Sequence, residues 1–555
     1  MATYILLAPV LFLLLGAILI LFLGEERHRE GWDPLPLLIT ALAFVASLLL
    51  HDELPVRVAL SSWRPLPQFR AELVYYADGL ALPWALLMTL LTLAAILSSL
   101  DRPLRPPEKK RLYAASFFLS AAGLSLVLSA NLITLCLSWA LLDLGICALI
   151  HLQKEGEHSV ATRAFAINGL TGMALLAAAL MVSQSEASVT LAGGVVPPIA
   201  LSLIVLAALV RMGFYPLHLG LPLTEGRTWS DALYRLIPAS AGTYLLVRAG
   251  SLARESIPLQ GVLLLLGCLT MVASATLAWG EAQRSRALSW VAIHQISTVV
   301  LAMGLGTPPM TIVALLQAGH LVLAMGLLFL GQEMEASSHR EALLLRAFWA
   351  LAVASLLGLP PSLGFVARWA FYRHAIEGGA WLLTLLSGAA NALILTPLLS
   401  MRHPPASPGR GAFVEASLAG LSLLGLPIVI LGVQPRLLIP FVQTVGGAAS
   451  RTYLARLISG GHVLLNLEIL IAILWPLLLG YGLYRARRAM TERGEALASD
   501  ICSWMEWTWL YRRLWRGALR LGTALGSLMS LLEGRSALAW IALLALAVAL
   551  LIVGG

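Results

Sequence analysis

The sequence predicts an all-α polytopic membrane protein of roughly sixteen transmembrane helices, including two broken helices. Composition is the first observation behind this prediction, because 59% of the 555 residues are hydrophobic and only 12% are charged. The second is that apolar runs of about 18 to 25 residues, long enough to cross the hydrocarbon core as helices, recur along the whole chain. The third is that the connecting segments are short, so no soluble domain larger than about residues 50–77 is expected.

The expected membrane spans follow one another with short loops between them. They are Ile5–Leu23, Leu35–Leu50, Gly79–Leu100, Tyr113–Leu128, Ile133–Leu152, Ala166–Val182, Pro198–His218, Ala232–Val247, Leu259–Ala278, Ala287–Leu305, Thr311–Leu330, Leu343–Gly358, Trp381–Leu399, Phe413–Leu431, Val463–Leu483 and Leu538–Val553. Phe365–Tyr372 is a short continuation of the span that ends before Pro360 and Pro361. No basic residue precedes the first span, so we expect it to be retained as a helix.

The positions of Lys and Arg in the short loops predict the orientation in the membrane. A cluster formed by Arg102, Arg105 and the run 109–111, together with Arg340, falls on one side, which we expect to be cytoplasmic. This arrangement places the N-terminus outside a cell or inner membrane, although several arginines, among them Arg248, fall on the outer side. The net charge of +8 therefore indicates contact with anionic lipids and not binding of nucleic acid.

Six segments are expected. They are N-terminal helices (1–110), a first bundle (111–250), a second bundle (251–402), additional helices (403–484), an amphipathic lateral segment (485–535) and a C-terminal helix (536–555). The lateral segment mixes arginines with tryptophans, a combination typical of a helix lying at the membrane surface. It either anchors the tail or braces neighbouring helices and subunits.

Charged side chains inside the membrane are costly and usually functional. Asp143 lies about ten residues into its span, and Arg211 is the expected partner, near the end of a span interrupted by Pro216 and Pro222. The pair is either a switchable element of an ion path or a fixed lock between two helices. Arg368 follows a second interruption, at Pro360 and Pro361.

His294 and His320 both lie at membrane depth, and histidine is the side chain that titrates nearest to neutral pH. They are therefore candidate proton relays, although a buried histidine can equally be a structural hydrogen-bonding residue. The four cysteines show no spacing of a metal site or disulfide framework. No phosphate loop, dinucleotide motif or nucleophile elbow is found, so no catalytic residue, metal or cofactor is assigned to the chain.

The segment VRMGFYPLHLGLPLTEGRTWSDAL resembles the antiporter-like membrane subunits shared by respiratory complex I, membrane-bound hydrogenases and Mrp cation/proton antiporters. The matching positions are Pro216, Leu217, His218, Leu221, Pro222, Gly226 and Thr228. ADGLAL at 77–82, SRALSWVAIHQIS at 285–297, HLVLAMGLLFLGQ at 320–332 and GLPPSLGF at 358–365 extend the resemblance to about residues 75–400. It implies two inverted five-helix repeats, each with one broken helix, in a subunit of a larger complex with membrane and redox partners.

The chain departs from the family pattern at its charged positions. The helix-five Trp-Glu pair has become Trp139-Ala140, with Asp143 on nearly the same helix face. Arg211 and Arg368 stand where the family has lysine, or lysine or glutamate, and Arg235 is the cation nearest to the helix-eight lysine position. Guanidinium stays charged, so arginines cannot pass protons on.

Two classes of function follow. In the first, the chain translocates protons, with a switchable Asp143–Arg211 pair, His320 as the principal titrating residue of the second half, and His218, Arg235 and His294 on the path. Any oxidoreductase chemistry would then belong to partner subunits. In the second, it is a structural or energy-coupling subunit with a degenerate proton path. An Mrp-like cation/proton antiporter subunit is a further alternative.

Overall fold

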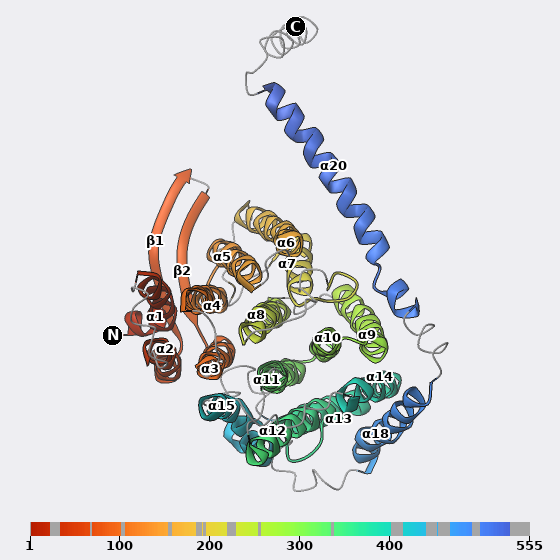
Figure 1. The fold of residues 1–555 in the computed structure, drawn as a ribbon. Coiled ribbons are helices and arrows are strands. Elements are labelled where there is room, and N and C mark those ends of the chain that lie inside the picture. Colours follow the sequence, from red (N-terminus) through yellow and green to blue (C-terminus); the bar gives the residue numbers. More distant parts are fainter. Residues whose placement is uncertain are drawn as a thin grey trace, which may run out of the picture. The chain divides into compact units, whose positions relative to one another are not determined.

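The structure is a computed structural model, and it describes residues 2–22, 34–66, 69–100, 106–153, 158–184, 191, 196–218, 229–252, 257–332, 334, 338–400, 414–439, 452, 467–490 and 500–532. The chain divides into two units, Met1–Met490 and Thr491–Gly555, which are described separately. In the first unit long helices run side by side, and Figure 1 views them nearly end-on. Each helix makes its backbone hydrogen bonds within itself, and the water-free core of a membrane requires such internal bonding.

The helices and strands have the following bounds. They are α1 (Ala2–Phe22), α2 (Pro34–Glu53), β1 (Val56–Leu66), β2 (Phe69–Ala77), α3 (Ala81–Ser99), α4 (Pro106–Val127), α5 (Leu132–Gln153), α6 (His158–Gln184), α7 (Pro198–Arg211), α8 (Ser230–Leu252), α9 (Ile257–Gly280), α10 (Arg284–Gly304), α11 (Pro308–Gly331), α12 (His339–Leu357), α13 (Leu363–Glu377), α14 (Trp381–Ser400), α15 (Val414–Val433), η3 (Pro435–Leu438), α18 (Leu467–Arg488) and, in the second unit, α20 (Thr508–Leu532).

The protein is a multi-pass membrane protein. Within the described ranges, 11 helices are long and apolar enough to cross a membrane. α7, with 14 residues, is too short to be counted among them. The last predicted span, Leu538–Val553, lies outside the described residues.

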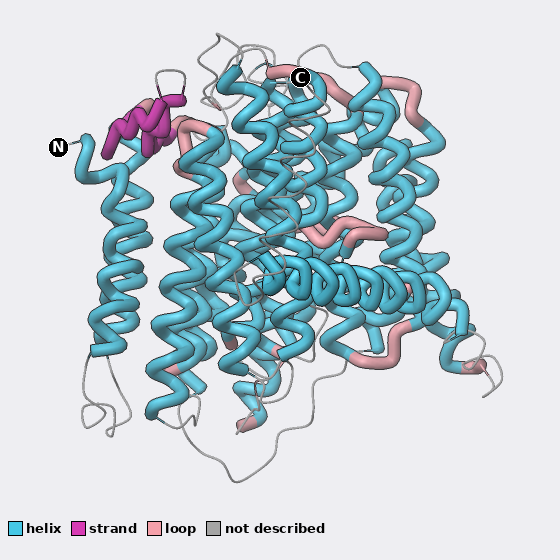
Figure 2. Tube along the Cα trace, turned by 90° about the horizontal axis from the view of Figure 1, so that it is seen from above, coloured by secondary structure: helices cyan, strands magenta, loops and turns pink. Residues whose placement is uncertain are grey.

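The expectation of an all-α chain is wrong in one place. β1 and β2 form an antiparallel pair in which Val56 lies opposite Ala77 and Val58 opposite Tyr75, and Figure 2 shows them at one end of the helices. Hydrogen bonds from Tyr76 N to Leu128 O (2.7 Å) and from Ala130 N to Val74 O (2.9 Å) attach β2 to the turn between α4 and α5. Alternating and β-branched residues in 56–59 and 72–77 carried this signal, which the search for long apolar runs overlooked.

Two sets of helices surround an enclosed centre. α4, α5, α6, α7 and α8 pack in succession, and α4 also packs on α8. α9, α10 and α11 follow, with α12 and α13 on α11 and with α14 back on α9. The apolar windows of α10 and α11 are entirely buried, and both helices lie in the middle of Figure 1. Their polar side chains are therefore shielded from lipid.

Both sets contain an interruption. α7 ends at Arg211, and Gly213 follows with φ 75°. α12 ends at Leu357, Gly358 has φ 72°, and α13 begins after Ser362, whose side chain accepts a hydrogen bond from Phe365 N. Glycine adopts such positive φ values without a side-chain clash, so each helix ends cleanly at its glycine. Pro222 lies outside the described residues.

Candidate functional site

The first half holds a buried ion pair between α5 and α7. Arg211 Nη1 donates to Asp143 Oδ1, and the two side chains are 0% and 4% exposed. The expected contact is therefore present. The guanidinium carbon also lies 4.0 Å from the centre of the Trp139 ring, a cation–π contact. Trp139 is held in turn by a 3.3 Å hydrogen bond from its Nε1 to Thr171 Oγ1 on α6.

This pair is incomplete within the described part of the chain. Arg211 Nε and Nη2 are buried, and no hydrogen-bond partner for them is present among the described residues. A guanidinium has five donors and needs more than one acceptor when it is buried. Arg211 can therefore accept a further ligand, such as water, without giving up Asp143.

Arg235 links α8 to the start of α10. Its Nη1 donates to Ser289 Oγ, its Nη2 donates to Ser285 Oγ at 3.1 Å, and the residue is 1% exposed. The guanidinium carbon lies 5.0 Å from the centre of the Phe329 ring of α11. These contacts, with neutral hydroxyls and an aromatic face, hold a positive charge between three helices.

His218 lies just after the interruption that follows α7. Its ring stacks on the Tyr215 ring, with the ring centres 5.9 Å apart, and packs against the Trp290 ring of α10, with the centres 4.8 Å apart. Its Nδ1 lies 3.0 Å from Pro216 O. The interruption therefore carries a buried imidazole from the first half to the face of α10.

The two candidate relay histidines lie on adjacent helices, but no hydrogen bond described in the structure joins them. His294 Nε2 lies 3.1 Å from Asn391 Oδ1 of α14, and its Nδ1 lies 3.3 Å from Met271 O of α9. His320 Nε2 lies 2.8 Å from Gln317 Oε1 of its own helix. Its buried Nδ1 has no hydrogen-bond partner among the described residues, so a proton between the histidines would have to travel through water.

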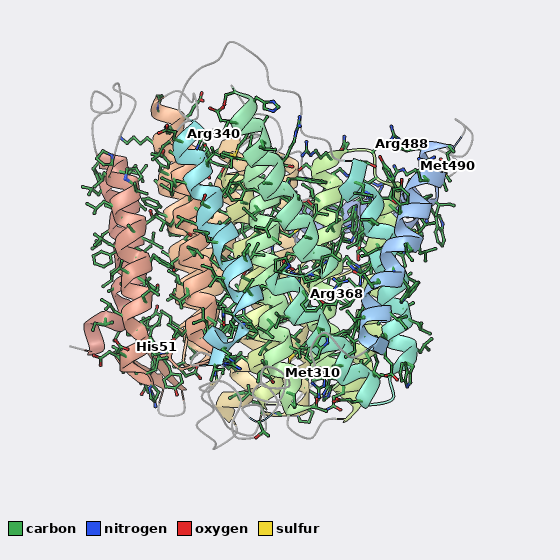
Figure 3. The ribbon with its side chains drawn as sticks, turned by 90° about the horizontal axis from the view of Figure 1, so that it is seen from below. His51, Met310, Arg340, Arg368, Arg488 and Met490 are labelled. Carbon is green, nitrogen blue, oxygen red and sulfur yellow. The ribbon has the colours of Figure 1, made fainter. Side chains whose placement is uncertain are left out.

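Arg368 caps the end of the interrupted helix α12. Its Nη2 donates to Leu356 O at 2.8 Å and lies 3.4 Å from Gln295 Oε1, while Gln295 Nε2 donates to Leu356 O at 3.1 Å. A cation is favourable at a helix C-terminus, where the last carbonyls are unpaired. Figure 3 shows Arg368 midway between one end of the molecule, with His51 and Met310, and the other, with Arg340 and Arg488.

A second ion pair was not predicted. Arg248 of α8 donates to both carboxylate oxygens of Asp78, each at 2.7 Å, and its Nη2 donates to Tyr244 OH at 2.9 Å. Asp78 also accepts from the backbone of Leu80 and Ala81 at the start of α3. Burial raises the pKa of Asp78, but these hydrogen bonds and the charge of Arg248 outweigh it and hold the pKa below its ordinary value.

The sequence contained some signal for the residues that were missed. Asp78 lies in the ADGLAL motif, but its partner is 170 residues away in the chain. Asn391 is a polar residue in an apolar run, and it contacts both His294 and Tyr372. Within the described ranges, no cluster of His, Cys, Asp and Glu is arranged to hold a metal ion.

These features define an antiporter-like membrane subunit, and comparisons with known proteins agree. Residues 129–394 match the family described as NADH:quinone oxidoreductase/Mrp antiporter, TM. This segment is just under half of the chain, and it contains both helix interruptions. Subunit L of the NADH-quinone oxidoreductase of Mycobacterium tuberculosis is 26% identical over 413 residues, which cover 68% of this chain and 65% of that protein. The match thus spans just under two thirds of the relative's length.

Other relatives come from the antiporter branch and from solved structures. Na(+)/H(+) antiporter subunit A1 of Staphylococcus haemolyticus is 25% identical over 312 residues, covering 54% of this chain and 38% of that protein. A chain of the Mrp complex of Dietzia sp. superposes with a TM-score of 0.79 at 21% sequence identity. The superposition covers 100% of this chain and 62% of the Dietzia chain. A chain of an archaeal membrane-bound sulfane sulfur reductase superposes with a TM-score of 0.73 at 17% sequence identity, covering 99% of this chain and 100% of the reductase chain. These structures share the fold and belong to multi-subunit membrane complexes.

Proposed function

We propose that this chain is the ion-translocating subunit of a multi-subunit complex in the cytoplasmic, or inner, membrane. It moves protons, or exchanges a cation for a proton, along a polar axis through the enclosed centre, and redox subunits supply the energy. The observation that carries the proposal is the buried Asp143–Arg211 pair, which places a titratable carboxylate inside the apolar bundle. A structural helix contact has no need of a charge there, because small or apolar residues pack helices in membranes.

Asp143 is the switch in this mechanism. With its proton removed it is held by Arg211, and with its proton added the attraction to the guanidinium is lost while the guanidinium stays charged. The freed positive charge then repels protons on the next groups along the axis. Ion-pair opening in the first half thereby changes the proton affinity of groups further on.

Histidines carry the protons in this scheme, and arginines set the electrostatic field. His218, His294 and His320 lie on or against α10 and α11, whose apolar windows are entirely buried. Arg235 and Arg368 hold fixed positive charges near these helices. Their charge limits how long a proton stays on a neighbouring imidazole, which favours transfer over storage.

The packing supports two related halves. Residues 111–250 and 251–402 each contain one interrupted helix, and in each set the first helix packs on the last, α4 on α8 and α9 on α14. Inverted repeats with interrupted helices are a common transporter design. We infer that these two bundles correspond to the repeats, with residues 1–110 and 403–484 as flanking helices and 536–555 as a final helix.

The charges at the two ends support an orientation with the N-terminus outside. Arg340 and Arg488 lie at the same end in Figure 3, opposite His51, and basic residues favour the cytoplasmic side. α20 forms the main helix of the 485–535 segment, with Trp509, Leu514, Leu521 and Leu525 exposed. Anionic headgroups and partner subunits are the surfaces that suit such a helix.

Proton movement by the complex that co-purifies with this chain tests the proposal. Reconstituted vesicles with a pH-sensitive dye inside should acidify or alkalinise on addition of the redox substrate, and Asp143→Asn and His320→Ala should each reduce the rate at least about tenfold. Thr276→Ala, whose hydroxyl donates to Val272 O of its own helix, is the control. Normal pumping by both site variants would replace this proposal with the structural, energy-coupling one.

The structural alternative has one observation in its favour. Arg211, Arg235 and Arg368 are all arginines, and a guanidinium cannot release a proton. An Mrp-like antiporter would show itself differently in the same vesicles. Its proton flux would follow an imposed Na⁺ or K⁺ gradient in the absence of any electron donor.

A further inference from the structure

A chain of hydrogen bonds runs from His294 through two further helices. His294 Nε2 lies 3.1 Å from Asn391 Oδ1, Asn391 Nδ2 donates to Tyr372 OH at 3.1 Å, and Tyr372 OH lies 3.3 Å from Ser387 Oγ. All four residues are at most 3% exposed. The chain therefore crosses α10, α14 and α13 without contact with lipid.

The contacts of His294 do not suit a neutral ring. Both of its nitrogens face oxygens that can only accept, Met271 O at 3.3 Å and Asn391 Oδ1 at 3.1 Å. A neutral imidazole has one N–H, so one nitrogen would turn a lone pair toward an oxygen. An imidazolium has two N–H groups, and it would satisfy both contacts.

Rotation of the Asn391 amide by a half turn gives the complementary arrangement. Asn391 Nδ2 then donates to the unprotonated Nε2 of His294, while Nδ1–H still donates to Met271 O. Asn391 Oδ1 now accepts from Tyr372 O–H, and Ser387 O–H donates to Tyr372. The hydrogen bonds that join the four side chains are kept in both arrangements, and an amide has nearly the same shape in both orientations.

We propose that Asn391 is a positioning residue for a proton on His294, and that its amide turns over when His294 gains or loses that proton. The inference rests on the proposed function, because it needs protons to reach the buried centre. In the step, a proton from water adds to the Nε2 lone pair of His294, and the reverse step returns it to water. The amide and the two hydroxyls only exchange the direction of their hydrogen bonds, so no other bond is made or broken.

The surrounding charges make the protonated state short-lived. Arg368 of α13 is the charged group that acts on His294, and its positive charge opposes a second one. The helices around His294 carry further ionisable groups, whereas α14 carries none. They are Asp231, Tyr234, Arg235, Tyr244 and Arg248 on α8, Cys268 on α9, Arg284 and Arg286 at the start of α10, His320 on α11, and Tyr372, Arg373, His374 and Glu377 on α13. The Asn391 oxygen and the Met271 carbonyl are thus the groups that stabilise the imidazolium.

Turning of the amide also reverses the Tyr372–Ser387 hydrogen bond. When His294 is protonated, Tyr372 donates toward Ser387, and when it is neutral, Ser387 donates toward Tyr372. The network therefore points in opposite directions in the two states.

The test compares Asn391→Asp, Asn391→Leu and a matched control in the complete complex. A carboxylate offers oxygen only, so Asn391→Asp should raise the titration midpoint of His294 by about one to three pH units. Infrared difference spectra of ring-labelled histidine report that midpoint, with His294→Ala identifying the band. Asn168→Asp, at the other described buried helical asparagine, should leave the midpoint in place.

Proton pumping in the same samples separates this inference from the function it rests on. Asn391→Asp should shift the pH profile of pumping toward higher pH, in step with the midpoint. Asn391→Leu should lower the rate at every pH. A shift of less than about 0.3 units for Asn391→Asp, with pumping retained, would overturn the role of Asn391 and leave the proposed function intact. The effect of the Asp143 variants on the pumping rate tests the proposed function only, and it does not test the role of Asn391.

Discussion

Two buried arginines end up with opposite kinds of partner in the two halves of the molecule. Arg211 meets a carboxylate on another helix, whereas Arg368 meets the carbonyl of Leu356 and the amide of Gln295. The first arrangement depends on the protonation of Asp143, whereas the described groups around Arg368, which include the Tyr372 hydroxyl, contain no carboxylate. In the proposed mechanism, proton-dependent switching therefore belongs to the first arginine, and a constant electrostatic field belongs to the second.

Removal of Asp143 is the change with the largest expected effect. Asp143→Leu leaves Arg211 charged and buried without its carboxylate, which should cost about 3–5 kcal/mol of folding free energy. Arg211→Leu should cost less, because the remaining carboxylate can take up a proton and become neutral. Thermal unfolding of the purified variants measures both, and the double variant should recover most of the loss. Equal losses for the two single variants would contradict the asymmetry.

Gly358→Ala tests the second arrangement through its backbone. Gly358 has φ 72°, and an added Cβ would lie 2.7 Å from Arg368 Cδ and 2.9 Å from its Nε. Strain and displacement of Arg368 together should destabilise the protein by about 1–3 kcal/mol. Gly213→Ala has similar backbone strain at the other interruption, with φ 75°. Gly169→Ala, where a Cβ meets nothing within 4 Å, should be neutral or stabilising in the same thermal assay.

Asp78 and Arg248 form a second carboxylate–arginine pair, and Asp78 lies outside the membrane spans. The stability that this pair contributes should therefore depend on the pH of the solution. The folded pKa of Asp78 lies below the unfolded value of about 3.9, so its stabilisation is complete above about pH 4 and is lost as pH falls through the folded value. Asp78→Asn should lower stability by about 1–3 kcal/mol at pH 7. The difference from the unmodified protein should shrink below pH 4, and a constant difference down to pH 3 would contradict this account.

Arg368→Lys should have the smallest effect. One nitrogen, Nη2, lies near both oxygen atoms, so an ammonium can reproduce these contacts and keep the charge at the end of α12. The expected loss is below about 1 kcal/mol, with pumping unchanged or faster because lysine can exchange protons. Arg211→Lys should be worse, because it also loses the planar contact with Trp139. Equal behaviour of the two lysine variants would remove the distinction between the halves.

The sequence was informative where charge or length carried the signal. Asp143 and Arg211 stood out because charges in apolar runs are rare, and only one acidic candidate existed for that arginine. The long apolar runs likewise marked most helices, since hydrocarbon thickness sets their length. α7 ends at Arg211, earlier than its predicted span, because a run of hydropathy continues past the point where Gly213 turns the backbone.

The remainder depended on contacts between distant residues. The pairing of Arg368 with Leu356 O could not be predicted, because every residue has a carbonyl and only the fold decides which are unpaired. Asn391 and Tyr372 gave little signal for the same reason, since neutral polar residues occur in many membrane helices. The strands were missed because a short hairpin adds no apolar run.

The attachment of β2 holds the start of α5 and thereby sets the position of Asp143 along that helix. Asn131, just before α5, donates to Glu72 O at 2.8 Å and accepts from Thr134 N, while Val74 N donates to Thr134 Oγ1 at 3.0 Å. α5 is thereby tied to the hairpin, and at 1.5 Å per residue Asp143 lies about 18 Å below Asn131. The hairpin is thus the point from which the position of Asp143 along α5 is set. A displacement of the hairpin along the axis of α5 would therefore also displace Asp143 relative to Arg211.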